Sequence, residues 1–178
     1  MKTLSRYTQS AKYAFLAALI AMPALAAPVA KKAQPDPKPS MGPVANYAAQ
    51  GGVRQCLGRI DQLSNFLTAG ATSGANVFIN PREPDRGLTS VSMEVQGNNG
   101  LSYVATAFSP AATSCDGTYE AITYWGGSCD QVAASFPGFK RVNPLRQHIQ
   151  TLDGGPYAKV YLMPAGQGCI SIKKETVY

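Results

Sequence analysis

Cys129 and His148 are the residues of this chain whose types and order could support nucleophilic catalysis. The sequence predicts a helix that starts at Cys129, and a helix dipole stabilises a thiolate at the helix N-terminus. His148 is the only histidine, and on a nearby strand its imidazole could act as the base. These two residues therefore define a cysteine-hydrolase hypothesis.

Other features of the chain weigh against this hydrolase. Papain-like hydrolases also place the cysteine before the histidine, but the strands predicted before Cys129 do not resemble the start of that scaffold. A free nucleophile would also leave three cysteines, an odd number, to form bridges. A serine hydrolase is less favoured still, because the chain has no Gly-x-Ser-x-Gly elbow. Catalysis by Cys129 and His148 therefore remains the alternative, and a protein without enzymatic activity is favoured.

Two pairs of acidic residues could serve in acid and base catalysis. Glu83 and Asp85 form one pair, and Asp116 and Glu120 form the other. Arginines and turn-forming residues interleave with them, which is typical of solvated loops. We therefore expect these carboxylates to lie in solvated loops.

The four cysteines are the strongest indication of the protein's compartment. An even number in an exported chain predicts two disulfides. We favour Cys115–Cys129, which flanks one predicted strand, and Cys56–Cys169, which would join the first helix to the last strand, although three pairings are possible. A zinc site or a redox-active dithiol is not expected, because the chain has no Cys-x-x-Cys spacing. No metal or cofactor is therefore predicted.

The N-terminus has the pattern of a cleavable signal peptide. Lys2, Arg6 and Lys12 make a positive leader, and residues 13–21 form an apolar core too short to cross a bilayer. Alanines at the minus-three and minus-one positions favour cleavage after Ala26. We therefore predict a periplasmic or secreted protein with no transmembrane anchor after cleavage.

Charge and composition divide the rest of the chain. Removal of residues 1–26 discards three basic residues and no acidic ones, so the formal charge falls from +6 to +3. The mature part shows no cluster of Lys and Arg, so a nucleic-acid partner is not expected. Residues 27–43 are proline-rich and predict an extended, flexible arm. Residues 44–178 have the length of a single domain.

The pattern of residues in this domain predicts an α+β fold. Apolar residues recur every three or four positions between Val44 and Leu67, which indicates one long amphipathic helix whose well-formed part begins near Val53. Gly70 is a plausible terminator. Ser128 and Gln131 have capping-box spacing and predict a short second helix.

Alternating and β-branched segments predict an antiparallel sheet of about six strands in two meanders. The turn Asn98-Asn99-Gly100 marks one of its hairpins. The two helices should cover this sheet, with two disulfides stapling the fold. The predicted strands are residues 88–96, 101–108, 118–125, 147–152, 157–163 and 169–174.

Aromatic residues on these strands suggest a binding surface. Tyrosine and tryptophan combine a large contact area with few rotamers to freeze. If Tyr119 and Trp125 face the helix, Ile122 and Tyr124 face outward. We predict that Ile122, Tyr124, Trp125 and Tyr161 contribute to the binding site.

The leading functional hypothesis is therefore a non-enzymatic binding module, such as an inhibitor, an immunity-type protein or an envelope accessory protein. Its partner is expected to be another envelope or secreted protein. The papain-like hydrolase that uses Cys129 and His148 is the alternative, and a carrier of a small ligand is a third possibility.

Overall fold

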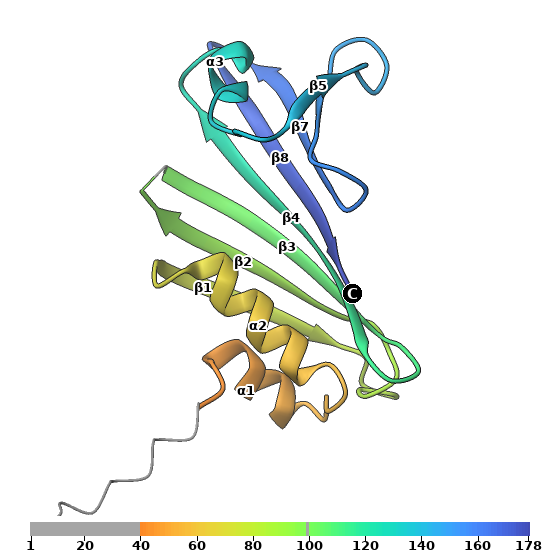
Figure 1. Ribbon diagram of the computed structural model, residues 1–178. Coiled ribbons are helices and arrows are strands. Elements are labelled where there is room, and N and C mark those ends of the chain that lie inside the picture. The colour runs from red at the N-terminus through yellow and green to blue at the C-terminus, as the bar shows by residue number, and fades with distance from the viewer. Residues whose placement is uncertain (1–39, 99) are drawn as a thin grey trace, which may run out of the picture. The chain divides into compact units, whose positions relative to one another are not determined.

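The computed structural model describes residues 40–98 and 100–178, which form an α+β fold of three helices and one antiparallel sheet (Figure 1). The helices are α1 (Pro43–Gln50), α2 (Leu57–Thr68) and α3 (Cys129–Ala133). The strands are β1 (Thr72–Ile79), β2 (Thr89–Gly97), β3 (Gly100–Pro110), β4 (Cys115–Trp125), β5 (Lys140–Val142), β6 (Gln150–Asp153), β7 (Ala158–Ala165) and β8 (Gly168–Val177).

The first part of the chain lies mostly outside the described residues. The predicted signal peptide, residues 1–26, falls entirely outside them, as does the predicted arm up to residue 39. The arm's last residue, Pro43, instead opens α1. Proline is favoured there because its fixed φ suits the first helical turn and its missing N–H is not needed.

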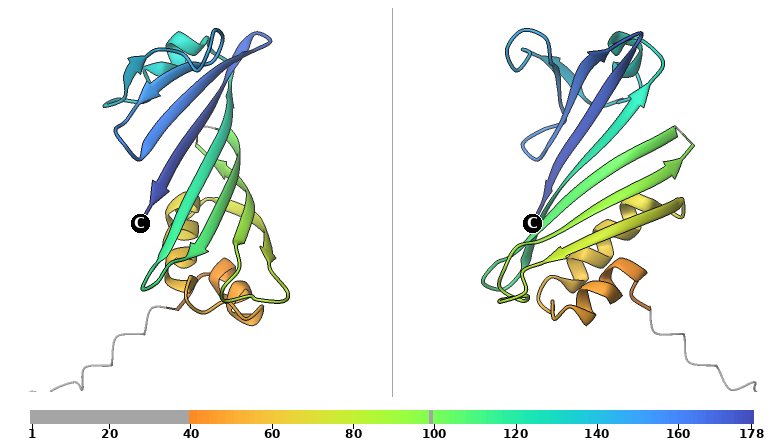
Figure 2. Two further views of the ribbon diagram at one scale, coloured as in Figure 1. Left: turned by 90° about the vertical axis from the view of Figure 1, so that its right-hand side faces the viewer. Right: turned by 180° about the vertical axis from the view of Figure 1, so that it is seen from behind.

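The sheet consists of two four-stranded meanders joined edge to edge. Its strand order is β1-β2-β3-β4-β8-β7-β6-β5, and every neighbouring pair is antiparallel. The six predicted strands and the two meanders are confirmed, and β1 and β5 are additional (Figure 2). The predicted hairpin of β2 and β3 is also present, since Gly97 pairs with Gly100, which has a φ of 105°; Asn99 of the predicted turn lies outside the described residues.

The single long helix predicted before the sheet is two helices. Gly51 ends α1, and its N–H bonds to the carbonyl of Tyr47. Gly52 then takes a φ of 95°, a left-handed conformation that glycine adopts without strain. The chain therefore turns between α1 and α2. Ala69 and Gly70 end α2, both with positive φ, close to the predicted terminator.

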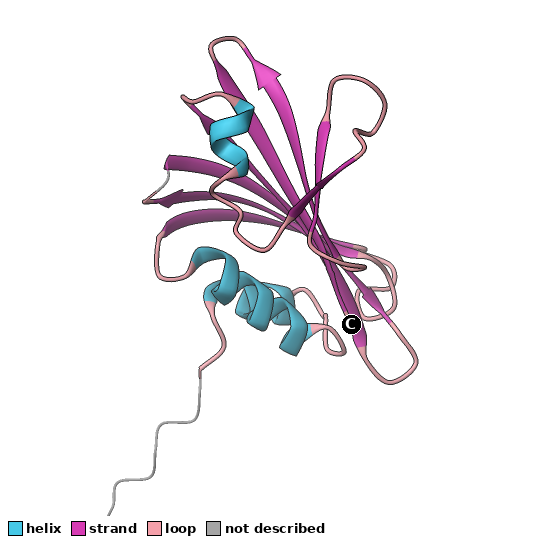
Figure 3. Cartoon of the chain, turned by 45° about the horizontal axis from the view of Figure 1, so that its top comes forward, coloured by secondary structure: helices cyan, strands magenta, loops and turns pink. Residues whose placement is uncertain are grey.

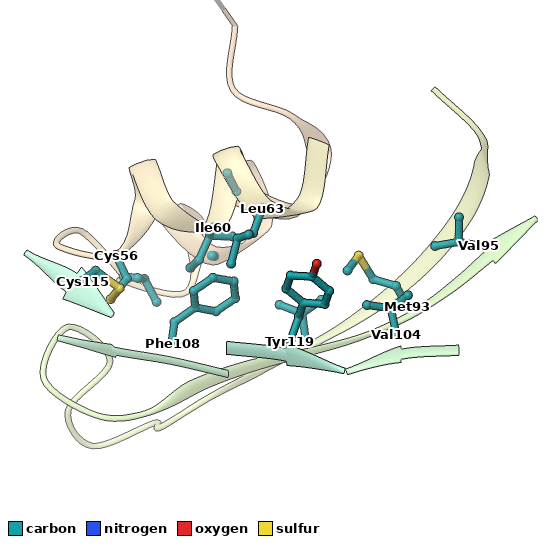
Figure 4. Close-up of a cluster of buried hydrophobic side chains, with 13 residues drawn as sticks. Cys56, Ile60, Leu63, Met93, Val95, Val104, Phe108, Cys115 and Tyr119 are labelled. Carbon is teal, nitrogen blue, oxygen red and sulfur yellow. A yellow bond between two sulfur atoms is a disulfide. The ribbon is translucent and has the colours of Figure 1, made fainter. Parts of the chain in front are cut away.

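One core lies between α1, α2 and the first meander. Ile60 and Leu63 of α2 pack in a cluster with Met93, Phe108 and Tyr119 of the sheet (Figure 4). These five side chains are at most 4% exposed. Full burial of an apolar side chain of this size contributes about 1.5 to 3 kcal/mol, so this cluster is a main source of stability.

A second core lies between α3 and the second meander. Val132 of α3 packs in a cluster with Leu152, Val160 and Leu162 of the sheet. Side chains alternate along β4, and Trp125 lies six residues after Tyr119, so both residues belong to the same face. Trp125 packs against the second core and Tyr119 belongs to the first. Both sets of helices therefore cover one face of the sheet (Figure 3).

The disulfides join Cys56 to Cys115 and Cys129 to Cys169, so the predicted pairing was wrong. Cys115 begins β4, and Trp125 ends it ten residues later, about 33 Å away at 3.3 Å per residue. Disulfide-bonded cysteines need Cα atoms within about 7 Å, so cysteines that flank an extended strand cannot pair. Each observed bridge has a Cα–Cα distance of 5.1 Å and ties one helical cover to the strands beneath it.

These two bridges indicate an oxidising, extracytoplasmic compartment. Among the described residues, no helix has both the length and the apolar character needed to span a membrane.

Candidate functional site

The face of the sheet opposite the helices is called the outer face. Alternation along β4 decides which residues reach it: Tyr119 is 2% exposed in the helix-covered core, whereas Tyr124 is 57% exposed on the outer face. Ile122 is two residues before Tyr124 and shares its face. The structure thus agrees with the predicted orientations of Tyr119, Ile122 and Tyr124.

An apolar row crosses four strands of the outer face. Ile122 of β4 pairs with Tyr103 of β3 on one side and with Ile172 of β8 on the other. Ile172 pairs in turn with Tyr161 of β7. Directly paired residues of antiparallel strands lie about 4.5 to 5.5 Å apart on the same face, so these four side chains are neighbours.

A second row lies beside the first and enlarges it. Tyr124 pairs with Ile170, and Ile170 pairs with Met163. We call the two rows together the outer patch. It consists of Tyr103, Ile122, Tyr124, Tyr161, Met163, Ile170 and Ile172.

Two ion pairs border the outer patch beside the first row, on the side away from the second row. Lys174 forms a 2.7 Å ion pair with Glu120, and Lys159 forms a 2.8 Å ion pair with Asp153. Exposed ion pairs of this kind add little to stability. They leave this side of the patch close to neutral, whereas on the β2 side the exposed carboxylate of Glu94 lies beside Tyr103.

Trp125, the fourth residue predicted to bind, lies on the helix-covered face instead. Its ring packs edge-on against Phe136 with ring centroids 6.5 Å apart, and its Nε1–H donates a 2.8 Å hydrogen bond to the hydroxyl of Ser171. Its position in the second core follows from alternation, since it directly follows the outward-facing Tyr124. The structure therefore brings together Ile122, Tyr124 and Tyr161, and separates Trp125 from them.

Cys129 and His148 do not form the pair that the hydrolase hypothesis needs. The sulfur of Cys129 is bonded to Cys169, so the bridged protein has no thiolate at this position. His148 is exposed in a bend before β6, which begins at Gln150 and not at the predicted residue 147. It lines a shallow hollow with Leu145 and Met163, at the border of the outer patch.

Two of the four carboxylates considered for acid and base catalysis, Asp85 and Glu120, have structural partners. Asp85 accepts 2.7 Å hydrogen bonds from the backbone N–H groups of Arg54 and Gln55, and these bonds lower the pKa of its carboxyl group. Asp85 thus anchors its loop to the segment before α2. In the described part of the chain, no three His, Cys, Asp or Glu side chains lie close enough to hold a metal ion.

A hollow of about 450 Å³ lies on the helix-covered face, between the end of α2 and strands β2 to β4. Small residues such as Ala121 line it, together with Ser102 and Thr123, whose hydroxyls hydrogen-bond to each other at 2.7 Å. Because these two hydroxyls satisfy each other, neither is free to orient a ligand.

Sequence reasoning missed Met163, Ile170 and Ile172 as members of the outer patch. The alternation of β8 could have identified both isoleucines, because they alternate with Cys169 and Ser171, which the structure buries. Comparisons with protein-family models, with curated proteins and with solved structures found no match.

Proposed function

We propose that the protein is an exported, non-enzymatic module that binds another secreted or envelope protein through the outer patch. One observation carries this proposal: the apolar row of Tyr103, Ile122, Ile172 and Tyr161 has no covering helix in the described chain. The two disulfides support a location outside the cytoplasm. They also stiffen both halves of the sheet, which lowers the entropy lost on binding.

The shape of the outer patch favours a protein as the partner. Four neighbouring strands span about 14 Å at 4.8 Å per gap, and a sheet face is broad and open. Small ligands bind in concave sites that bury most of their surface. Exposed tyrosines beside half-buried aliphatic residues instead match the centre of a protein interface. The partner should therefore present an apolar surface of similar width.

Site-directed photo-crosslinking in the exporting cell tests this proposal. A photoreactive amino acid at position 124 probes the outer patch, and the same group at position 66 is the matched control. Tyr124 is 57% exposed and Phe66 is 61% exposed, but Phe66 lies on α2, on the other side of the sheet. We expect a discrete adduct from position 124 alone. No adduct, or equal adducts from both positions, would contradict the proposal.

A substitution then shows whether the adduct depends on the apolar row. Ile122→Asp places a charge in the centre of the patch, so the adduct should disappear and the affinity for the purified partner should fall at least about tenfold. Ser90→Asp adds the same charge to a half-buried position of the outer face on β2, away from the patch, and should leave binding unchanged.

The hydrolase alternative has its own test. Free thiols are counted with an alkylating reagent in the denatured but unreduced protein. The proposal expects none, whereas a cysteine hydrolase requires at least one.

A further inference from the structure

The two edges of the sheet differ in a way that indicates a second interface. Edge strands expose unpaired N–H and C=O groups, and proteins usually protect them with charges, proline, bulges or short strands. The β5 edge follows this rule, since it has three residues that include Lys140 and Arg141. The β1 edge does not: its eight residues pair with β2 without a bulge and include neither a charged residue nor proline.

A groove runs along this unprotected edge. It has a volume of about 460 Å³ and lies between β1 and α1, which also has no charged residue. Val44 and Tyr47 of α1 line it together with β1 side chains from both faces of the sheet, such as Ala75 and Phe78. Tyr47 and Phe78 are 59% and 57% exposed. The groove therefore offers apolar side chains that an additional strand beside β1 could contact.

We propose that β1 pairs antiparallel with β1 of a second copy of this chain, so that two sheets become one. A two-fold axis perpendicular to the sheet keeps the outer faces of both copies on the same side. With that axis at Asn76, Val77 lies opposite Ala75 of the second copy and Phe78 lies opposite Gly74. Ile79 then lies opposite Ser73.

The sequence of β1 is self-complementary in this register. Its first half, Thr72 to Ala75, is small, and its second half, Val77 to Ile79, is bulky. Antiparallel pairing sets each bulky residue against a small one on both faces, which fills space without a clash. Self-pairing of strands needs this size pattern, whereas pairing with an unrelated peptide does not.

Charge also favours a second copy as the occupant. Without the three basic residues of the predicted signal peptide, the chain has a formal net charge of +3, so the two copies repel each other weakly overall. The edge formed by α1 and β1 is uncharged and can meet itself without placing like charges together. The outer patch remains free in this dimer, and two patches facing the same way would bind a repeated partner more tightly than one.

Sedimentation equilibrium of the disulfide-bonded protein, over a wide range of concentrations, tests the dimer. Asn76→Lys places two ammonium groups opposite each other at the axis, and we expect the dimer dissociation constant to rise at least about tenfold. Ser109→Lys adds the same charge to an exposed site at the end of β3 and should leave the dimer intact. Circular dichroism confirms that both variants fold.

A cysteine at the axis provides an independent readout. Paired residues of antiparallel strands have Cα atoms about 4.5 to 5.5 Å apart, within the range for a disulfide. Asn76→Cys should therefore form a covalent dimer on mild oxidation, while Ser109→Cys should not. A wild-type protein that stays monomeric at every concentration overturns the proposal. So does a dimer that Asn76→Lys leaves unchanged.

Discussion

Tyr119 donates a 2.6 Å hydrogen bond to the carboxylate of Glu175, its direct partner in the β4–β8 pair. Lys173 completes the group, with its ammonium 3.1 Å from the same carboxylate and 5.5 Å from the centre of the Tyr119 ring. Tyr119 is buried beneath α2, whereas the side chains of Lys173 and Glu175 are about one third exposed. This group therefore links the first core to the pair of strands that joins the two meanders.

The Tyr119–Glu175 bond makes stability sensitive to alkaline pH. Burial raises the pKa of the Tyr119 phenol above its ordinary value of 10.0, and the hydrogen bond to Glu175 acts in the same direction. The stabilisation that the protonated Tyr119 phenol provides is complete below pH 10. It is lost as the pH rises through the raised pKa of the folded protein. At neutral pH, Tyr119→Phe should lower the free energy of unfolding by about 1 kcal/mol. Urea unfolding should show this difference shrink above pH 10; a constant difference would contradict the assignment.

Glu175 makes stability sensitive to acid. Burial alone would raise the pKa of its carboxyl group, but the hydrogen bonds from Tyr119 and Lys173 and the charge of Lys173 outweigh that effect and lower it. The stabilisation from the ionised Glu175 is therefore present at pH values above the ordinary pKa of 4.5. It is lost as the pH falls through the lowered pKa of the folded protein. Glu175→Gln should weaken the dependence of urea midpoints on pH below 5. A Glu83→Gln variant, in an exposed loop, should not.

Alternation and capping predicted much of the fold and part of the site. The pattern of β4 correctly placed Tyr119 inside and Tyr124 outside, because neither position contains a bulge that would reverse the faces. The capping box at Ser128 and Gln131 is present as predicted, since it is a local interaction that depends on few residues. Features set by local geometry were thus accessible from the sequence.

Features that depend on the arrangement of strands were not accessible in the same way. β1 was missed because its first half is small and polar, and its alternation becomes visible only opposite β2. Trp125 was included in the binding site for its residue type, although alternation already placed it on the same face as Tyr119, and its hydrogen bond could not be predicted. Its partner Ser171 is 46 residues away in sequence, and that contact requires β8 to lie beside β4.

The disulfide pairing can be verified by digestion without reduction. Trypsin leaves Cys115 and Cys129 on one peptide, residues 87–140, so the two bridges should hold this peptide together with those containing Cys56 and Cys169. Chymotrypsin cleaves after Tyr119, Tyr124 and Trp125 and separates the two halves. Mass spectrometry should then find Cys56 linked to Cys115 and Cys129 linked to Cys169. A peptide containing Cys115 and bonded to Cys169 would refute this connectivity.

Gly168 occupies a position where any side chain would collide with the neighbouring strand. A Cβ added there would overlap the carbonyl oxygen of Trp125 and lie 2.6 Å from the hydroxyl of Tyr124. That carbonyl belongs to the backbone of β4, which pairs with β8 beside it, so it cannot move without disturbing the junction of the two meanders. Gly168→Ala should therefore lower the free energy of unfolding by about 1 to 3 kcal/mol.

Gly126→Ala is the matched control for this substitution. It adds the same methyl group directly after β4, where nothing lies within 4 Å of the new Cβ, and should change stability by less than about 0.5 kcal/mol. Trp125, the only tryptophan, reports urea unfolding of both variants by its fluorescence. Similar unfolding midpoints for the two variants would mean that β4 and β8 can separate at Gly168 at little cost. This result would contradict the prediction that β4 and β8 are held rigidly together at Gly168.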